Sequence, residues 1–117
     1  MSRQRYIPDR GDLVWLDFRP QAGREQAGRR PAVVVSPKTY NRPTHLALVC
    51  PVTNRSKGYP FEVRIPGAVA IQGVVLADQL KSLDWQARKA EFAGRLDAAT
   101  LAEVVGKVMA LVSVDED

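Results

Sequence analysis

Apolar residues in this chain occur in short runs that are separated by proline, glycine and polar segments. Most of the runs are rich in valine and other residues that favour strands over helices. The run PAVVVS is apolar almost throughout and predicts a central buried strand. The run LALVCPV predicts another, which we expect to end at Pro51 because proline cannot donate to a ladder. Strands are therefore expected over residues 11–18, 31–36, 46–52, 61–65 and 73–77.

The C-terminal segment has a different period. Its apolar residues recur at helical spacing and form one stripe, and Asp97 is placed to cap the helix: Leu101, Val104, Val105, Val108, Leu111 and Val112. Residues 38–44 predict a polar turn or one helical turn, and residues 78–90 fit either a helical turn or a long edge strand. We expect a single domain over 1–117, mainly β with α, as a small β-barrel or strongly bent sheet packed by the C-terminal helix.

Several function classes are disfavoured by what the sequence lacks. No apolar run approaches the ~18–20 residues that span a bilayer, and the start, MSRQRYIPDRGD, has no apolar stretch typical of a secretory signal. The one cysteine, Cys50, and the one histidine, His45, fit a buried inert thiol and a packing or surface residue. We therefore expect a cytoplasmic protein with no membrane partner, no metal and no cofactor.

Positive charge is concentrated in the middle of the chain. The net charge is +4, but residues 24–64 hold eight cations against Glu25 and Glu62, whereas residues 97–117 are net acidic. A concentrated positive field favours polyanions, with nucleic acid first among them, although a solvated basic surface has the same composition.

Residues 19–30, RPQAGREQAGRR, predict a long loop that abuts the strand 31–36. Glu25, Arg29 and Arg30 are the residue types that metal-free RNA cleavage needs, since a carboxylate can take a proton and a guanidinium can stabilise a phosphorane. If the strands 31–36 and 46–52 are neighbours, Thr53 approaches Arg30 and can bond a phosphate oxygen. The polar-turn interpretation of both segments stays open at this stage.

Other side chains could extend such a site. Arg55 and Lys57 would continue the positive surface along a phosphate backbone. Phe18 and Tyr59 could stack on unpaired bases, whereas Phe61 better fits the core.

The runs GDLVW, EQAGRRP, PVTNRSKGYPFEV and GVVLADQLKSLDWQAR, at these separations, resemble the MazF/PemK family of toxin endoribonucleases. The resemblance spans roughly residues 5–113. It implies an SH3-like, CcdB-like barrel with a C-terminal helix, and a homodimer, which the doubly apolar strand 11–18 also suggests. It further implies metal-independent cleavage of single-stranded RNA at short, ACA-containing motifs, which leaves a 2′,3′-cyclic phosphate and a 5′-hydroxyl. A cognate MazE-like antitoxin would inhibit the enzyme by laying an acidic, hydrophobic tail over its groove.

The resemblance also assigns residues. It places the catalytic arginine on Arg30, the catalytic threonine on Thr53 and the active loop glutamate on Glu25, with Gln26 and Gly28 completing the loop motif. Arg29 stands where close relatives can differ, and we expect its charge to strengthen phosphate binding. Because arginine is a poor general base, Arg30 is expected to stabilise charge and Glu25 to take the proton.

Two alternatives remain. A gyrase-poisoning toxin of the same fold would need an aromatic near the C-terminus, but this chain ends VMALVSVDED. The other is an RNA-binding module that has lost its catalytic activity.

Overall fold

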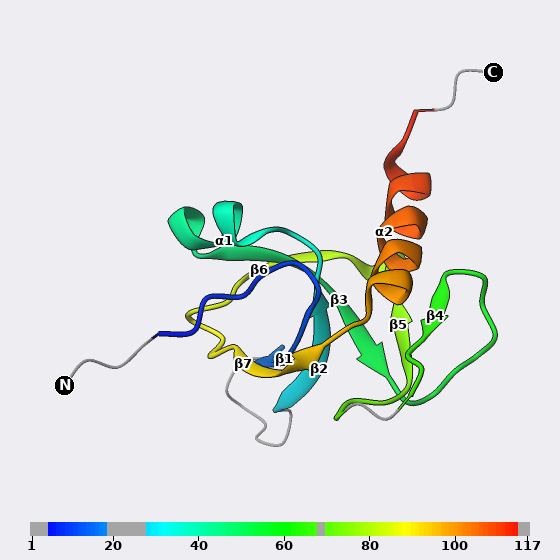
Figure 1. Cartoon of the computed structure of the whole chain (residues 1–117), viewed down its shortest axis with the longest axis horizontal. Helices are drawn as coiled ribbons and strands as arrows, with labels where there is room; N and C mark the ends of the chain where they lie inside the picture. The colour runs from blue at the N-terminus through cyan, green and yellow to red at the C-terminus, as the bar shows by residue number, and fades with distance from the viewer. Residues whose placement is uncertain (1–4, 19–27, 68–69, 115–117) are drawn as a thin grey trace.

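Strands dominate the structure, a computed structural model that describes residues 5–18, 28–67 and 70–114. Figure 1 shows the strands wrapped into a strongly curved sheet, with helix α1 at one side and helix α2 at the other. The strands are β1 (Asp12–Asp17), β2 (Arg29–Val34), β3 (Leu46–Thr53), β4 (Glu62–Arg64), β5 (Val74–Leu76), β6 (Lys81–Asp84) and β7 (Glu91–Arg95). The helices are α1 (Lys38–Thr44), the 3-10 turn η2 (Ala77–Gln79) and α2 (Ala98–Val112).

All strand pairs are antiparallel, and the sheet runs in the order β4-β5-β3-β2-β1-β7, with β6 also paired to β3. Strand β3 bends the sheet, because Leu46–Val49 pair with β6 whereas Val52 and Thr53 pair with β5. In the described residues β4 and β7 end the sheet and do not pair with each other, so the expected closed barrel is not confirmed. The chain is mainly β, with an open sheet of seven strands in those residues.

Pro51 corrects one expectation. Strand β3 continues through Pro51 to Thr53 instead of ending at the proline. Pro51 lies between the residues that pair with β6 and those that pair with β5. A missing N–H is tolerated at such a gap in the ladder.

The core lies in two clusters, because successive residues of each strand point to opposite sides of the curved sheet. Leu13, Val33 and Cys50 belong to one cluster, which also contains Val104 of α2. Val14 and Leu16 belong to the other, which is completed by residues of β2, β3 and β6 and by Trp85. Leu13, Val14 and Leu16 are therefore buried by the chain itself, whereas Trp15 of the same strand is 37% exposed.

Helix α2 begins as expected. The carboxylate of Asp97 accepts hydrogen bonds from the backbone N–H of Thr100 at 3.1 Å and from its hydroxyl at 2.7 Å. The first turns pack through Val104, which is fully buried, but Val112 near the C-terminal end is 67% exposed. In Figure 1 this end of α2 projects beyond the sheet.

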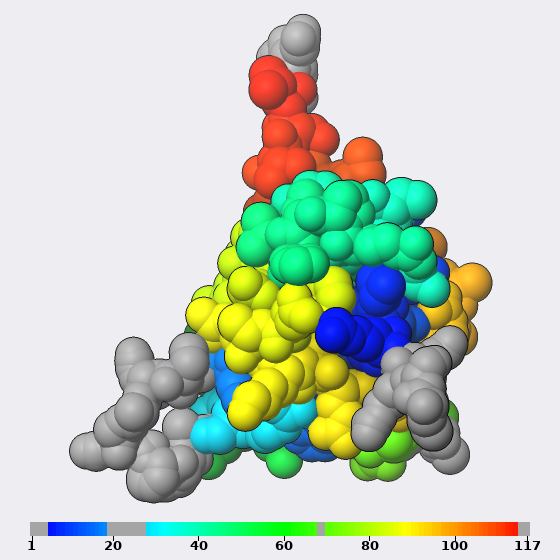
Figure 2. Space-filling view, turned by 90° about the vertical axis from the view of Figure 1, so that its left-hand side faces the viewer, coloured from blue at the N-terminus to red at the C-terminus, as the bar shows by residue number. Residues whose placement is uncertain are grey.

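The segment 38–44 forms a complete helix, which is more than the single turn expected. It is fixed by Asn41, a buried residue whose amide donates to the carbonyls of Pro8 at 2.8 Å and Ser36 at 2.9 Å. Figure 2 shows α1 on the surface above the segment that contains β6 and β7. His45 ends the helix in a left-handed conformation and contacts the edge of Trp85, in agreement with a packing role.

Candidate functional site

A pocket of about 720 Å³ opens where β2 and β3 leave the core. It contains five cationic side chains and two carboxylates, so its field is positive. We call it the Arg30 pocket, and its lining is Phe18, Arg30, Pro51, Val52, Thr53, Arg55, Lys57, Tyr59, Glu62, Leu76, Asp78, Gln79, Lys81, Leu83 and Arg88.

Arg30 reaches this pocket because of strand alternation. It lies on β2 two residues before Ala32, which is fully buried, and Val34 continues the same row into the core. Arg30 itself is exposed. The buried part of β2 thus fixes the backbone, while the guanidinium remains in solvent. An arginine buried in the core could not contact a substrate, and Arg30 is not buried.

Thr53 and Arg30 line the same pocket. The paired register of β2 and β3 ends at Ala32 and Pro51, and its continuation by two residues would place Arg30 opposite Thr53. Side chains directly opposite in an antiparallel pair have Cβ atoms about 4.5–5.5 Å apart. Both residues also line a second, adjoining pocket of about 330 Å³, which contains Trp15, Asn54 and Gln72. The shared pockets and the continued register therefore support the expected approach of Thr53 to Arg30.

The Thr53 hydroxyl has a defined orientation. Its oxygen accepts a hydrogen bond from the backbone N–H of Arg55 at 3.1 Å. A hydroxyl has one proton to donate, and a lone pair is the part used here. Accepting this hydrogen bond leaves the Thr53 hydroxyl able to donate its proton to another group.

Gly73 packs directly against the backbone of Thr53. A Cβ built on Gly73 would lie 2.3 Å from the carbonyl oxygen of Thr53, and the residue has φ +122°. Only glycine combines that backbone conformation with that approach. The close approach of Gly73 therefore helps to fix the position of the Thr53 backbone beside the pocket.

The loop 54–60, which holds Arg55 and Lys57, is folded around Glu62. The Glu62 carboxylate accepts from the Ser56 hydroxyl at 2.7 Å, from Lys57 N–H at 2.9 Å and from Gly58 N–H at 3.1 Å. These hydrogen bonds, with that of Ser56 the strongest, lower the pKa of Glu62 below its ordinary value. A carboxylate of lowered pKa with both oxygens occupied is a weak general base, so Glu62 orders the loop.

Helix α2 contacts the same loop. The Lys107 ammonium donates to the carbonyl of Pro60 at 2.8 Å. With Tyr59 56% exposed beside it, the loop presents an aromatic ring and two cations to solvent, Arg55 and Lys57. This combination suits a single-stranded polyanion with unstacked bases.

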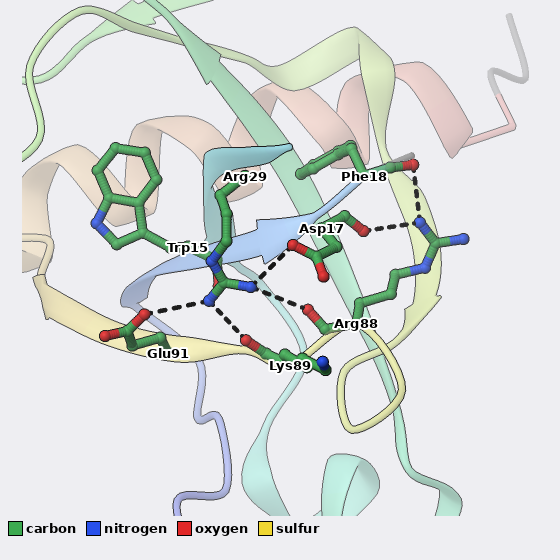
Figure 3. A network of polar contacts seen from close by, with 7 residues as sticks. All are labelled: Trp15, Asp17, Phe18, Arg29, Arg88, Lys89 and Glu91. Carbon is green, nitrogen blue, oxygen red and sulfur yellow. Dashed lines mark hydrogen bonds and ion pairs between the residues drawn. The ribbon is translucent and has the colours of Figure 1, made fainter. Parts of the chain in front are cut away.

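Arg29 is absent from the lining of the Arg30 pocket, and Figure 3 shows its guanidinium among Asp17, Lys89 and Glu91. It forms ion pairs with Asp17 at 3.0 Å and with Glu91 at 3.2 Å, and it donates to the backbone carbonyl of Lys89 at 2.7 Å. Its charge is therefore compensated within the chain, which argues against the added phosphate affinity expected from the sequence.

The remaining predicted site residues have three different placements. Glu25 and Gln26 lie outside the described residues. Gly28 has a left-handed backbone with φ +38° directly before β2. Phe18, Arg55 and Lys57 all line the Arg30 pocket.

Four polar lining residues between positions 78 and 88 were not predicted as site residues from the sequence: Asp78, Gln79, Lys81 and Arg88. They come from the segment around η2, β6 and the turn after it, where the sequence left helix and strand open. The basic residues of that segment were the available signal.

Cys50 is fully buried, as expected, and burial raises the pKa of its thiol to about 12. Across the described ranges there is no group of three or more His, Cys, Asp or Glu residues that could hold a metal ion. None of the helices in those ranges is long and apolar enough to cross a membrane.

Comparison with known proteins gives a consistent result. Residues 9–112 match the model of a family described as PemK-like, MazF-like toxin of type II toxin–antitoxin system. The chain is 50% identical over 108 residues to the endoribonuclease toxin MazF of Escherichia coli K12, covering 92% of this chain and 96% of the relative. It is 32% identical over 117 residues to the endoribonuclease PemK of Escherichia coli, covering 97% and 88%.

Solved structures give the same picture. The crystal structure of MazF from Deinococcus radiodurans superposes with a TM-score of 0.85 at 55% identity, covering 94% of this chain and 100% of that one. A MazE–MazF crystal structure from the same organism has a TM-score of 0.84 at 50% identity, covering 95% and 100%.

Proposed function

The chain belongs to the PemK-like, MazF-like family of toxins and is an endoribonuclease of that family, and we propose that it cleaves single-stranded RNA at Arg30 and Thr53 without a metal ion. The observation that carries the proposal is the pair itself. Arg30 is exposed and lines the same positive pocket as Thr53, which the continued β2–β3 register would place opposite it.

The reaction we propose starts with a ribose 2′-hydroxyl of the RNA. A general base takes its proton, and the 2′-oxygen forms a bond to the adjacent phosphorus. The bond from phosphorus to the 5′-oxygen breaks, and that oxygen takes a proton from solvent. The products are a 2′,3′-cyclic phosphate and a 5′-hydroxyl.

Each residue has one task in this scheme. Arg30 stabilises the negative charge of the phosphorane, since its planar fork fits two phosphate oxygens and stays charged. Thr53 donates its hydroxyl proton to a non-bridging oxygen. We assign the general base to Glu25, the loop glutamate that the family resemblance implies; the Glu62 carboxylate already accepts three hydrogen bonds.

The substrate lies along the rest of the pocket. Phe18 and Tyr59 stack on unpaired bases, and Arg55 and Lys57 neutralise phosphates. Gln26 and Gly28 complete the EQAGRRP motif and are proposed to contact the RNA. The similarity to MazF favours short ACA-containing target sites, and we propose them for this chain.

Partners follow from the same surface. The neighbouring MazE–MazF structures contain an antitoxin, and we propose that an acidic MazE-like antitoxin occupies the positive pocket of this chain. We further propose a homodimer, which the exposed apolar end of α2 supports: Met109, Leu111, Val112 and Val114. A mass measured by light scattering at micromolar concentration tests this, and a monomer would contradict it. An enzyme that acts on messenger RNA would work in the cytoplasm.

The decisive experiment is cleavage of a long synthetic RNA of known sequence by the purified protein in EDTA, with mapping of cut sites and analysis of both end groups. We expect 2′,3′-cyclic phosphate ends. Arg30→Ala should abolish cleavage, and Thr53→Val should reduce it about 10²-fold, the cost of one lost oxyanion donor. Arg42→Ala, an exposed arginine on α1 outside the pocket, is the control and should cleave normally.

Three outcomes would contradict the proposal. Intact RNA would indicate a non-catalytic toxin or binding module. Cleavage that requires a divalent metal would contradict the assignment of Arg30 as the group that stabilises the phosphorane. Normal cleavage by Arg30→Ala would place the active site elsewhere.

A further inference from the structure

Two arginines join the base of the loop between β1 and β2 to the turn between β6 and β7. In Figure 3, the Arg29 guanidinium lies between the Asp17 and Glu91 carboxylates, and Arg88 points toward the end of β1. Asp17 and Arg29 form the last residue pair of the β1–β2 ladder. Beyond this pair the chain continues as residues 18–28. The network therefore lies at the point where the ladder ends.

Arg29 uses both terminal nitrogens of its fork. Nη1 donates to the Asp17 carboxylate at 3.0 Å, and Nη2 donates to the carbonyl of Lys89 at 2.7 Å and to that of Trp15 at 3.3 Å. Nη2 also contacts Glu91 at 3.2 Å. A lysine ammonium is a compact point charge and cannot reproduce this planar set of contacts.

Arg88 completes the connection from the other side. Its Nη1 donates to the carbonyl of Asp17 at 3.0 Å and to that of Phe18 at 2.9 Å. The backbone carbonyl of Arg88 in turn accepts from the N–H of Asp17 at 3.0 Å. Because Phe18 lines the Arg30 pocket, Arg88 fixes the backbone from which that ring enters it.

The turn that receives these contacts is itself rigid. The Asp84 carboxylate accepts from the N–H groups of Gln86 at 3.0 Å and Ala87 at 2.8 Å. Lys89 has a left-handed backbone at φ +55°, a conformation that non-glycine residues keep only when their surroundings fix it. The Lys89 carbonyl is the one that Arg29 contacts at the shortest distance in the network.

We propose that Arg29 and Arg88 are positioning residues, which fix Arg30 and Phe18 relative to each other by joining the end of the β1–β2 ladder to the 85–90 turn. This inference rests on the proposed ribonuclease function of the pocket. Arg30 follows Arg29 directly on β2, so a shift of Arg29 moves the residue that stabilises the phosphorane. Arg29 contributes geometry to the reaction, and its charge is used within the chain.

The test separates geometry from charge. Cleavage gives kcat and KM, and binding is measured against salt with an RNA whose 2′-oxygen at the cut site is methylated. We expect Arg29→Gln and Arg29→Lys to lower kcat by about 10- to 100-fold, the usual cost of a displaced catalytic group. Their salt slopes should match that of the wild type. Lys57→Gln is the matched comparison and should flatten the slope by about 0.7, the loss of one phosphate contact on a single strand.

Asp17→Asn provides a second variant in case the Arg29 variants fold poorly, which thermal melting would reveal. The positioning role predicts that Asp17→Asn also lowers kcat. A full rescue by Arg29→Lys, a flatter slope for Arg29→Gln, or a steeper slope with normal kcat for Asp17→Asn would each overturn the proposal. If the wild-type protein leaves RNA intact while the variants melt and bind normally, the proposed function fails instead.

Discussion

Replacing Gly73 by alanine should displace the backbone of Thr53, one of the two residues at the centre of the proposed active site. The added Cβ would lie 2.3 Å from the Thr53 carbonyl oxygen and 2.9 Å from its carbonyl carbon, closer than real Cβ atoms approach backbone. Neither group is the end of a flexible side chain, so the β3 backbone must shift. Because Thr53 pairs with Val74, the residue after Gly73, the ladder between β3 and β5 opposes that shift.

The magnitude has two parts. An alanine at φ +122° costs about 1–3 kcal/mol of backbone strain, and the overpacking against Thr53 adds about 1–3 kcal/mol. For a domain of this size 1 kcal/mol lowers Tm by about 4 °C, so the sum of about 2–6 kcal/mol predicts a fall of about 8–24 °C. Below the new Tm, kcat should still fall by about 10-fold or more, because the Thr53 hydroxyl has moved.

Gly67→Ala is the matched control. Gly67 has φ +78° but no atom of the described residues within 4 Å of a built Cβ, so backbone strain of about 1–2 kcal/mol is the expected cost. Melting by circular dichroism and steady-state cleavage at 20–25 °C would be measured for both variants. If Gly73→Ala melts like Gly67→Ala and cleaves RNA at the wild-type rate, the reasoning about Thr53 is refuted.

Three further predictions concern stability and reactivity. Asp97→Ala should cost about 1 kcal/mol and lower Tm by about 4 °C, because the cap to Thr100 is lost; an unchanged Tm would contradict the capping role. The folded-state pKa of Glu62 lies below its unfolded value, so its stabilisation is complete above about pH 4.3 and is lost as the pH falls through the folded pKa. Glu62→Gln should therefore melt with a weaker dependence on pH between about 5 and 2 than the wild type, and identical pH profiles would count against this. The Cys50 thiol, whose pKa burial raises to about 12, should react with a thiol reagent at pH 8 only as the protein unfolds, whereas rapid labelling of the native protein would show that the core is open.

Local composition was sufficient to predict most of the strands. The valine-rich runs formed β2 and β3, and their adjacency placed Arg30 near Thr53, as the sequence suggested. The prediction that β3 ends at Pro51 was wrong. A proline is accepted there because it lies between the part of β3 that pairs with β6 and the part that pairs with β5, and the sequence of β3 alone does not show this change of partner.

Long-range contacts set the limit of the sequence analysis. Arg29 has the charge of a phosphate-binding residue, but its partners Lys89 and Glu91 lie about sixty positions away, and only the fold brings them together. Likewise, Lys81 and Arg88 belong to a segment without a clear period, so their charge was the one local signal and only the fold places them in the pocket.

The Arg30–Thr53 pair lies on hydrogen-bonded strands, whereas Tyr59, Lys57 and Gln79 reach the same pocket from turns. Turns accept insertions and exchanges far more readily than paired strands do. Under the proposed assignment, the target sequence can therefore change through these turns while Arg30 and Thr53 are retained. Diversification of target choice then requires no new chemistry.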